Sequence, residues 1–521
     1  MKLLSTPLLF ALAAPAASQV LTFTPIVGPN DPVRSHGHSP ALDGDLVAFL
    51  GSDKTTNDTG IYVAAADGSG PYTVIVDDET PLPNVPGETF RFLDNPEIHQ
   101  GVVTFTAGHE LFSSTNDGIY QGSGGPVSVY FDHWNDLLGT PNPFAPLVEA
   151  GGVLFQSASA DQSQFLDFSQ PYFSVTPGSY VLAASGPLPG GGGLFHLTSS
   201  GDSLALGGGQ IAFSADVSAP SGFQSGVYTR GTDGSPIDLV ANWKTPMPGK
   251  PFPFENFWEV DTDGAQVVFV GQSGLISFGG HQGIYLAPVG AAGAGPITTL
   301  VELGDLDPSG REYLSFDRVA VEGELVIFGA IIPGAYGIYG AQGGQVFEIL
   351  DSTDQLDGVQ LGDVDFDFRG LDQGRLAVRV LYPITGGGLF PYGLYVVSIV
   401  DPVCQPDLGF GGPGSAVLSV CGEELSAGGT AELTLTGAPP QAPTFLVAGD
   451  QQAALPLLGG TLVPFPAAAV VPAVTDAAGE LALTLTGGQG PSTWYVQAVI
   501  ADPSQPQLFG FSNAVAVELL P

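Results

Sequence analysis

Basic residues are scarce in this sequence. Its 521 residues include 12 Lys and Arg against 52 Asp and Glu, which gives a formal net charge of −40 at pH 7. A charge of this sign and size repels both the phosphates of nucleic acids and anionic lipid surfaces. The composition therefore excludes nucleic acid as a partner.

Sustained helical patterns and uninterrupted membrane-spanning segments are also missing. The chain has 74 Gly and 45 Pro, more than helices tolerate, and its apolar residues alternate with polar ones between Gly, Pro and Asp turns. An uncharged run at 453–475 is broken as a membrane span by Pro456, Pro464, Pro466 and Pro472. We expect an all-β fold with very little helix and no transmembrane span.

The first 18 residues have the pattern of a secretory signal peptide. Lys2 provides a short basic region, residues 8–14 are apolar, and residues 16–18 are small, as cleavage before Gln19 requires. We therefore expect residues 1–18 to be removed and the protein to be secreted or associated with the cell surface.

Only two cysteines occur, Cys404 and Cys421. They lie close together in a chain that we expect to be exported, where disulfides form and persist, so we expect them to pair. A metal site built on these two residues would need further ligands, and no His lies nearby in the sequence.

A short motif, in most copies Gly followed by an apolar residue and Tyr, recurs seven times at intervals of about 55 residues. The third copy is degenerate, with Ser in the middle position. The copies are Gly60-Ile61-Tyr62, Gly118-Ile119-Tyr120, Gly178-Ser179-Tyr180, Gly226-Val227-Tyr228, Gly283-Ile284-Tyr285, Gly337-Ile338-Tyr339 and Gly393-Leu394-Tyr395.

Each repeat contains about four short strands. A strand that ends in Phe precedes most copies, as in 102–105 and 267–269, and a β-branched strand follows most of them. Such a unit is too small to bury its own faces, whereas seven units stacked around an axis bury them against one another. The repeat predicts a seven-bladed β-propeller, and the spacing alone leaves six or eight blades open.

The seventh repeat lacks its last strand. After Tyr395 the strand 396–400 leads into a linker at Pro402 and Cys404. The segment 21–27 resembles the missing strand, so we expect the N-terminal strand to complete the last blade and remove its exposed edge. The propeller is therefore expected over residues 19–402.

Composition changes abruptly near the linker. Residues 404–521 contain no Lys, Arg or His. Segments such as 431–436, 481–486 and 494–499 alternate apolar and polar residues, as strands with one buried face do. We expect residues 403–521 to form a small Ig-like β-sandwich.

Two resemblances follow from these motifs. The Gly-Ile-Tyr repeat, over roughly residues 21–402, resembles an uncharacterised propeller-repeat family of exported bacterial proteins. The tail, through the segments 404–409 and 419–422, resembles a C-terminal β-sandwich module common on exported proteins of environmental bacteria. Both resemblances imply architecture, and neither implies an activity.

Aligning the Phe-ending strands defines one column of residues, eleven positions earlier, on the first strand of each repeat. In a propeller the first strand of each blade lines the central channel. The column contains His38, Asp94, Phe144, Asp202, Trp258, Asp317 and Asp367. Strand alternation turns its acidic members toward the channel, where like charges raise one another's pKa.

A cation would neutralise this ring, and hard oxygen ligands suit Ca²⁺ or Mg²⁺. We therefore mark five residues as candidate metal ligands: His38, Asp94, Asp202, Asp317 and Asp367. Two alternatives stay open, a water-filled channel with solvated carboxylates and a pair of carboxylates that cleaves a sugar chain.

The sequence contains no nucleophile elbow, phosphate-binding loop, dinucleotide motif or metalloprotease helix. It favours an exported, non-enzymatic binding or structural protein whose propeller loops present a binding face for an extracellular carbohydrate or protein. We expect this protein to be a monomer. The alternative is a propeller enzyme, a glycoside hydrolase or polysaccharide lyase, that uses carboxylates at the channel mouth.

Overall fold

The computed structural model describes residues 19–28, 31–35, 40–83, 85–108, 118–132, 143–149, 152–158, 169–176, 179–182, 195–197, 204–219, 222–274, 279–290, 293–383, 392–400, 403–488 and 490–521. These residues form strands, turns and loops and contain no helix, so none of them lies in a helix long enough to cross a membrane. The prediction of an all-β fold is confirmed. The chain divides into two compact units, one at Leu21–Ser398 and one that contains Ile399–Pro521.

Seven sheets of four or five strands make up most of the first unit. The first sheet has the order β2-β4-β5-β6 with β3 beside β4: β2 (Val33–Ser35), β3 (Ala41–Asp43), β4 (Leu46–Asp53), β5 (Thr59–Ala65) and β6 (Thr73–Asp77). The second runs in chain order: β7 (Arg91–His99), β8 (Val102–Gly108), β9 (Gly118–Gly122) and β10 (Ser128–Asp132). The third does the same: β11 (Pro143–Glu149), β12 (Gly152–Ala158), β13 (Ser169–Thr176) and β14 (Ser179–Leu182).

The fourth sheet has the order β15-β17-β18-β19 with β16 beside β17: β15 (Phe195–Leu197), β16 (Leu204–Gly207), β17 (Gln210–Ala219), β18 (Gly222–Gly231) and β19 (Asp238–Asn242). The fifth comprises β20 (Asn256–Thr262), β21 (Gln266–Ser273), β22 (His281–Pro288) and β23 (Thr298–Glu302). The sixth comprises β24 (Ser315–Glu322), β25 (Leu325–Ile332), β26 (Ala335–Gln342) and β27 (Gln345–Asp351). A small hairpin of β28 (Gln355–Leu356) and β29 (Val359–Gln360) precedes the seventh.

The seventh sheet joins the two ends of this unit. Its order is β30-β31-β32-β1: β30 (Asp363–Asp372), β31 (Arg375–Leu381), β32 (Tyr392–Val400) and β1 (Val20–Val27). The N-terminal strand β1 therefore supplies the last strand beside β32, as the sequence predicts, and covers an edge that would otherwise be exposed.

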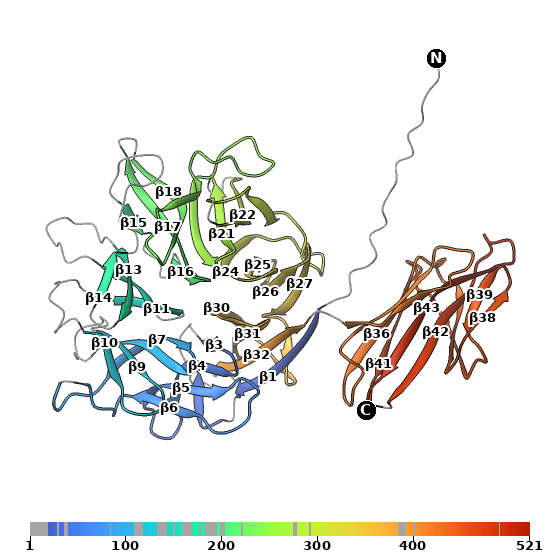
Figure 1. Ribbon diagram of the computed structural model, residues 1–521, viewed down its shortest axis with the longest axis horizontal. Helices are drawn as coiled ribbons and strands as arrows, with labels where there is room; N and C mark the ends of the chain where they lie inside the picture. Colours follow the sequence, from blue (N-terminus) through green and yellow to red (C-terminus); the bar gives the residue numbers. More distant parts are fainter. Residues whose placement is uncertain are drawn as a thin grey trace, which may run out of the picture. The chain divides into compact units, whose positions relative to one another are not determined.

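The seven sheets lie one after another around a common centre (Figure 1). The innermost strand of each sheet contacts the innermost strand of the following sheet, in the order β3, β7, β11, β16, β20, β24 and β30, and β30 contacts β3. The hydrophobic core lies between neighbouring sheets. One cluster, for example, joins Ile26 and Val27 of β1 and Val396 of β32 to Val47 and Phe49 of β4.

The repeated aromatic residues form the centre of each sheet. In five sheets the Phe and Tyr of the repeat are direct partners on neighbouring strands: Phe49↔Tyr62, Phe105↔Tyr120, Phe213↔Tyr228, Phe269↔Tyr285 and Phe328↔Tyr339. The Gly two residues before the Tyr leaves room for the ring, because a Cβ on Gly283 would lie 3.0 Å or less from two atoms of Tyr285. The motif is thus a packing motif.

The structure corrects the third copy of this motif. Phe155 of β12 pairs with Tyr172 of β13, whereas Tyr180 lies on β14, the outer strand, opposite Ser174. Tyr172 is therefore the equivalent residue. The sequence interpretation was wrong here because Tyr172 follows Pro171 and Gln170 and lacks the Gly that identifies the other copies.

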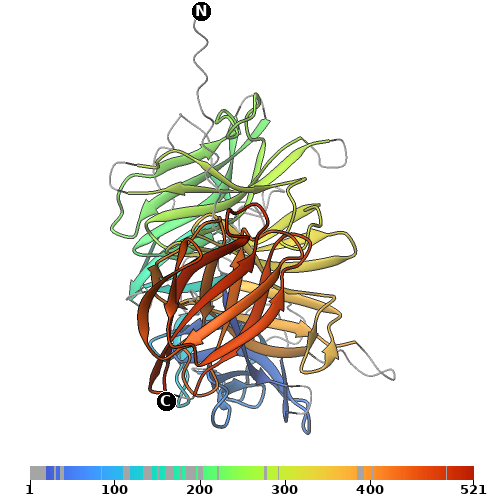
Figure 2. The ribbon, with the colours of Figure 1, turned by 90° about the vertical axis from the view of Figure 1, so that its right-hand side faces the viewer.

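The second unit consists of two sheets and a hairpin (Figure 2, orange to red). One sheet contains β33 (Val403–Cys404), β35 (Val417–Gly422), β36 (Thr430–Thr436) and β41 (Leu481–Thr486), in this order. The other contains β34 (Asp407–Gly409), β43 (Phe509–Leu519), β42 (Ser492–Ala501), β37 (Pro443–Gly449) and β40 (Ala469–Val474), in this order. The hairpin is formed by β38 (Gln452–Leu457) and β39 (Gly460–Pro464).

Both sheets of the second unit contribute to one core. Leu418 and Leu433 from the first sheet and Leu446, Ile500 and Val515 from the second belong to the same buried cluster. The predicted disulfide is confirmed, since Cys404 of β33 and Cys421 of β35 are bonded to each other across neighbouring strands.

Candidate functional site

The innermost strands of the first unit share an irregularity at the centre of that unit. Register shifts interrupt the pairing of β7, β11, β20, β24 and β30 with the second strand of their sheets. Asn95, Glu259 and Arg318 lie at three of these bulges with φ of 48°, 45° and 47°, in the left-handed region. A bulge breaks the alternation of side chains and redirects those that follow it.

The predicted channel column can be followed in the register of the sheets. Asp94, Phe144, Trp258 and Asp317 occupy the same place, each opposite the residue that follows the repeat Phe. In the seventh sheet this place belongs to Asp365, opposite Arg379, because the long bulge between Phe366 and Leu371 displaces Asp367. His38 and Asp202 lie outside the described residues.

The described members of the predicted metal site have separate surroundings. Asp94 is exposed, and its Oδ1 accepts a hydrogen bond from the backbone of Asn95. Asp317 Oδ1 accepts one from the Tyr336 hydroxyl at 2.6 Å. Within the described ranges, no three or more His, Cys, Asp or Glu side chains are grouped to hold a metal ion. The complete ring stays a prediction, because two of its five members lie outside those ranges.

Asp367 forms a buried ion pair with Arg369. Arg369 Nε lies 2.7 Å from Asp367 Oδ1, and Arg369 Nη2 lies 2.8 Å from Asp367 Oδ2, a bidentate contact of the strongest kind in proteins. The two side chains are only 4% and 2% exposed. On β7, Glu97 Oε2 lies 3.8 Å from Arg369 Nε. The guanidinium of Arg369 thus neutralises Asp367, one of the five residues predicted to bind a metal ion.

The pKa values of the two carboxyl groups beside Arg369 are shifted in opposite directions. Burial would raise the pKa of Asp367, but Arg369 outweighs it through charge and hydrogen bonds and holds this pKa below its ordinary value. Burial raises the pKa of Glu97 well above its ordinary value, and the more distant attraction of Arg369 opposes this only in part. Glu97 Oε2 has no hydrogen-bond donor among the described residues.

A third central carboxyl group lies on β20. Asp261 is 6% exposed and accepts a hydrogen bond from the backbone N–H of Val321 on β24, at 2.7 Å. Burial raises the pKa of Asp261 well above its ordinary value despite this bond, and the negative charge of Asp367 adds to the effect. The Asp261 contact ties the fifth sheet to the sixth.

Asp365 joins a second cluster of charges. Its Oδ1 lies 3.1 Å from Arg318 Nε of β24, and its Oδ2 lies 2.7 Å from Arg379 Nη2 of β31. Arg318 also donates to the carbonyl of Phe366 at 2.8 Å. These contacts bind the sixth sheet to the seventh.

Sequence reasoning missed Glu97, Asp261 and Arg369. One signal in the sequence points to this region: five of the 12 basic residues fall on the acidic innermost strands β7, β24 and β30 or on the neighbouring β31, namely Arg91, Arg318, Arg369, Arg375 and Arg379. An arginine on a buried strand that also carries acidic residues is expected to form an ion pair with one of them.

A further series of carboxylates links the turns that follow the innermost strands. Each accepts a hydrogen bond from the backbone of the turn in the next sheet. The bonds are Asp263 to Gly323, Glu322 to Gln373 and Gly374, Asp372 to Gly44, and Asp43 to Gln100. Some of the many acidic side chains of this protein therefore hold neighbouring sheets together through hydrogen bonds.

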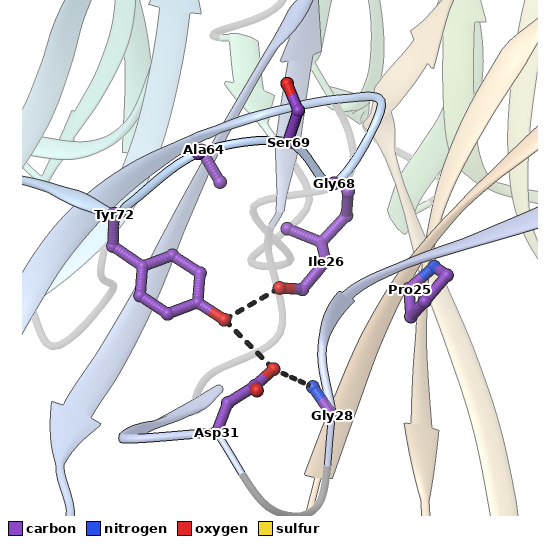
Figure 3. A pocket seen from close by; sticks show the side chains of 9 residues that line it. Pro25, Ile26, Gly28, Asp31, Ala64, Gly68, Ser69 and Tyr72 are labelled. Atoms are coloured by element: carbon purple, nitrogen blue, oxygen red, sulfur yellow. Dashed lines mark hydrogen bonds between the residues drawn. The ribbon is translucent and has the colours of Figure 1, made fainter.

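A pocket of about 480 Å³ lies where β1 passes the turn between β5 and β6 (Figure 3). The Tyr72 hydroxyl lies 2.9 Å from the carbonyl oxygen of Ile26 and 3.0 Å from Asp31 Oδ2, and the backbone N–H of Gly28 donates to the same oxygen of Asp31. Burial and the Asp31 carboxylate raise the pKa of Tyr72. Ser69 lines the pocket with its hydroxyl exposed. We call this cavity the rim pocket.

No protein-family model and no curated protein matches the chain. Among solved structures, the polysaccharide lyase Uly1 is 10% identical, with 70% of this chain and 90% of that chain covered and a TM-score of 0.40. The β-propeller domain of the Trilobed protease from Pyrococcus furiosus is 12% identical, with 70% and 93% covered and a TM-score of 0.42. An acylaminoacyl peptidase is 13% identical, with 79% of this chain but 59% of that chain covered and a TM-score of 0.43. These similarities are too low to assign an activity to this chain.

Proposed function

We propose that this chain is an exported, non-enzymatic protein that binds an extracellular carbohydrate or protein through the loops of a seven-bladed β-propeller. The sheets around a common centre and the pairing of β1 with β32 support the propeller. The two sheets with one core at Ile399–Pro521 support an Ig-like β-sandwich. The signal-peptide pattern and the disulfide support export.

The observation that carries a non-enzymatic role is that three of the central carboxylates are bound by the protein itself. Asp367 is paired with Arg369, Asp365 with Arg318 and Arg379, and Asp261 with a backbone N–H. A carboxylate held in this way stabilises the contact between sheets and is not free to exchange protons with a substrate.

The rim pocket offers a place for one sugar unit. Its volume falls in the range of small-molecule sites, and it presents a carboxylate, a hydroxyl and an aromatic ring, the groups that bind sugar hydroxyls and ring faces. The proposal is tested with the purified chain on an array of glycans. Asp31→Ala removes the carboxylate of the pocket and should weaken binding, whereas Ser123→Ala, on the exposed turn between β9 and β10, should leave it unchanged.

One observation favours the alternative, a polysaccharide-cleaving enzyme. Glu97, whose pKa is raised, and Asp367, whose pKa is lowered, both lie within 4 Å of Arg369 Nε, and two carboxyl groups with pKa values shifted apart can divide the roles of acid and base. Incubation with acidic and neutral polysaccharides, followed by size analysis of the products, separates the two functions. Chain shortening that is lost in Glu97→Gln would establish the enzyme, and glycan binding without shortening supports the binding protein.

A further inference from the structure

The second unit exposes an unusual share of large apolar side chains. It accounts for thirteen of the twenty that are exposed among the described residues, although Ile399–Pro521 supplies less than a third of those residues. Four of them lie on two strands that follow each other in the sequence: Val470, Val471 and Val474 on β40 and Leu483 on β41. We call these four residues the apolar edge.

Both strands of the apolar edge end their sheets. In the described part of the chain, β40 pairs only with β37 and β41 pairs only with β36. The turn at 475–480 joins the two strands, so that the chain crosses from one sheet to the other at this point. Each strand therefore presents one row of backbone groups without a neighbouring strand, beside the same opening.

The opening leads into the core of the unit. A pocket of about 270 Å³ lies between the sheets and is lined by Leu433, Leu446, Val471, Leu483 and Trp494, among others. The side chains of Leu481, Leu483 and Leu485 share one face of β41, since alternate residues of a strand do. This face is covered only in part, because Leu483 is 37% exposed and Leu481 and Leu485 are half-buried.

We propose that this opening binds an extended segment of another protein, which adds a strand to the free edge of β41 and places apolar side chains in the pocket. Exposed backbone groups beside an apolar pocket fit a strand, whose backbone bonds to the edge while alternate side chains fill the pocket. The partner strand adds to β41 and not to β40, because Pro472 lies within β40 and lacks an N–H for a ladder. β41 contains no Pro and no charged residue.

Charge identifies the chemistry of the partner. Residues 404–521 contain acidic residues and no Lys, Arg or His, and Asp476 and Glu480 are exposed at the turn that ends the opening. A segment with Lys or Arg beside its apolar residues gains attraction there. A second copy of this chain is disfavoured as the partner, because the acidic residues beside its own apolar edge would repel those of the first copy.

The test uses the full chain and two synthetic peptides, Lys-Lys-Thr-Val-Thr-Val-Thr-Val-Lys-Lys and its counterpart with Glu in place of Lys. Binding is followed by the fluorescence of Trp494, which lines the pocket, with Trp494→Phe as the signal blank. We expect the lysine peptide to bind, the glutamate peptide to bind at least ~10-fold more weakly, and a similar loss for Leu483→Gln. Ala482→Gln, exposed on the other face of β41, is the matched control and should retain the wild-type affinity.

Three results would overturn the proposal. The first is absence of binding of the lysine peptide, and the second is binding that Leu483→Gln leaves intact although the variant unfolds at the wild-type temperature. The third is a concentration-dependent dimer, seen by analytical ultracentrifugation and lost in Leu483→Gln, which would assign the apolar edge to a second copy of the chain.

Discussion

Asp372 accepts a hydrogen bond from the backbone N–H of Gly44, 328 positions away in the sequence, at 2.7 Å. The bond joins the turn of the seventh sheet to the turn of the first, where the series of sheets returns to its start. Asp372→Ala leaves this N–H without its acceptor and should lower the free energy of unfolding by about 1–2 kcal/mol. Denaturant midpoints measure the effect. Asp45→Ala, whose carboxylate is exposed in the same turn of the first sheet, should change the midpoint little, and equal effects of both variants would contradict this role.

The buried ion pair of Arg369 and Asp367 should contribute to the stability of the fold. Arg369→Met should destabilise the fold by about 3–5 kcal/mol, because it leaves the charge of the buried Asp367 uncompensated, with only the backbone N–H of residue 369 as a hydrogen-bond donor. The double variant Arg369→Met with Asp367→Asn removes both charges and should recover a large part of this loss. Thermal unfolding of wild type, both single variants and the double variant completes the cycle. If the losses of the two single variants simply added, the two side chains would not act as a pair.

The aromatic repeat could be predicted from the sequence because its chemistry is local. Phe and Tyr recur at fixed places in a strand, and the Gly before the Tyr is required by the ring of that Tyr, as at Gly337 and Tyr339. The third copy was misassigned because this local signal is missing there. Tyr172 takes the same place without the Gly, and only pairing with Phe155 identifies it.

The centre could be predicted only in outline. Counting residues back from the repeat Phe placed Asp94 and Asp317 correctly in one column, because their strands have the same length up to that point. Beyond the column the count fails, since the bulges insert one residue at Glu259 or Arg318 and more in β30. Each insertion turns the following side chains to the other face, and this is why Arg369 and Glu97 were not found.

Gly283 tests the packing explanation of the repeat. A Cβ at this position would lie 2.7 Å from the carbonyl oxygen of Val301 and 2.9 Å from the Tyr285 hydroxyl oxygen. Gly283→Ala should therefore destabilise the fifth sheet by about 1–3 kcal/mol through overpacking. Gly290→Ala is the control, since a Cβ there meets no atom within 4 Å. Urea unfolding of the two variants should separate them clearly, and an equally mild effect would remove the steric reason for the motif.

The pH dependence of stability follows from the raised pKa of Glu97. A carboxyl group whose pKa is higher in the folded state than in the unfolded state contributes most below the unfolded value, about 4.3 for Glu, and this contribution is lost as the pH rises toward the folded value. Gln has no such titration, so the stability of Glu97→Gln relative to wild type should increase as the pH rises from 4.5 to 8. Urea midpoints across this range measure the difference. A curve for Glu97→Gln that runs parallel to that of the wild type would mean that Glu97 titrates alike in the folded and unfolded states, and burial beside Arg369 would then not control its proton.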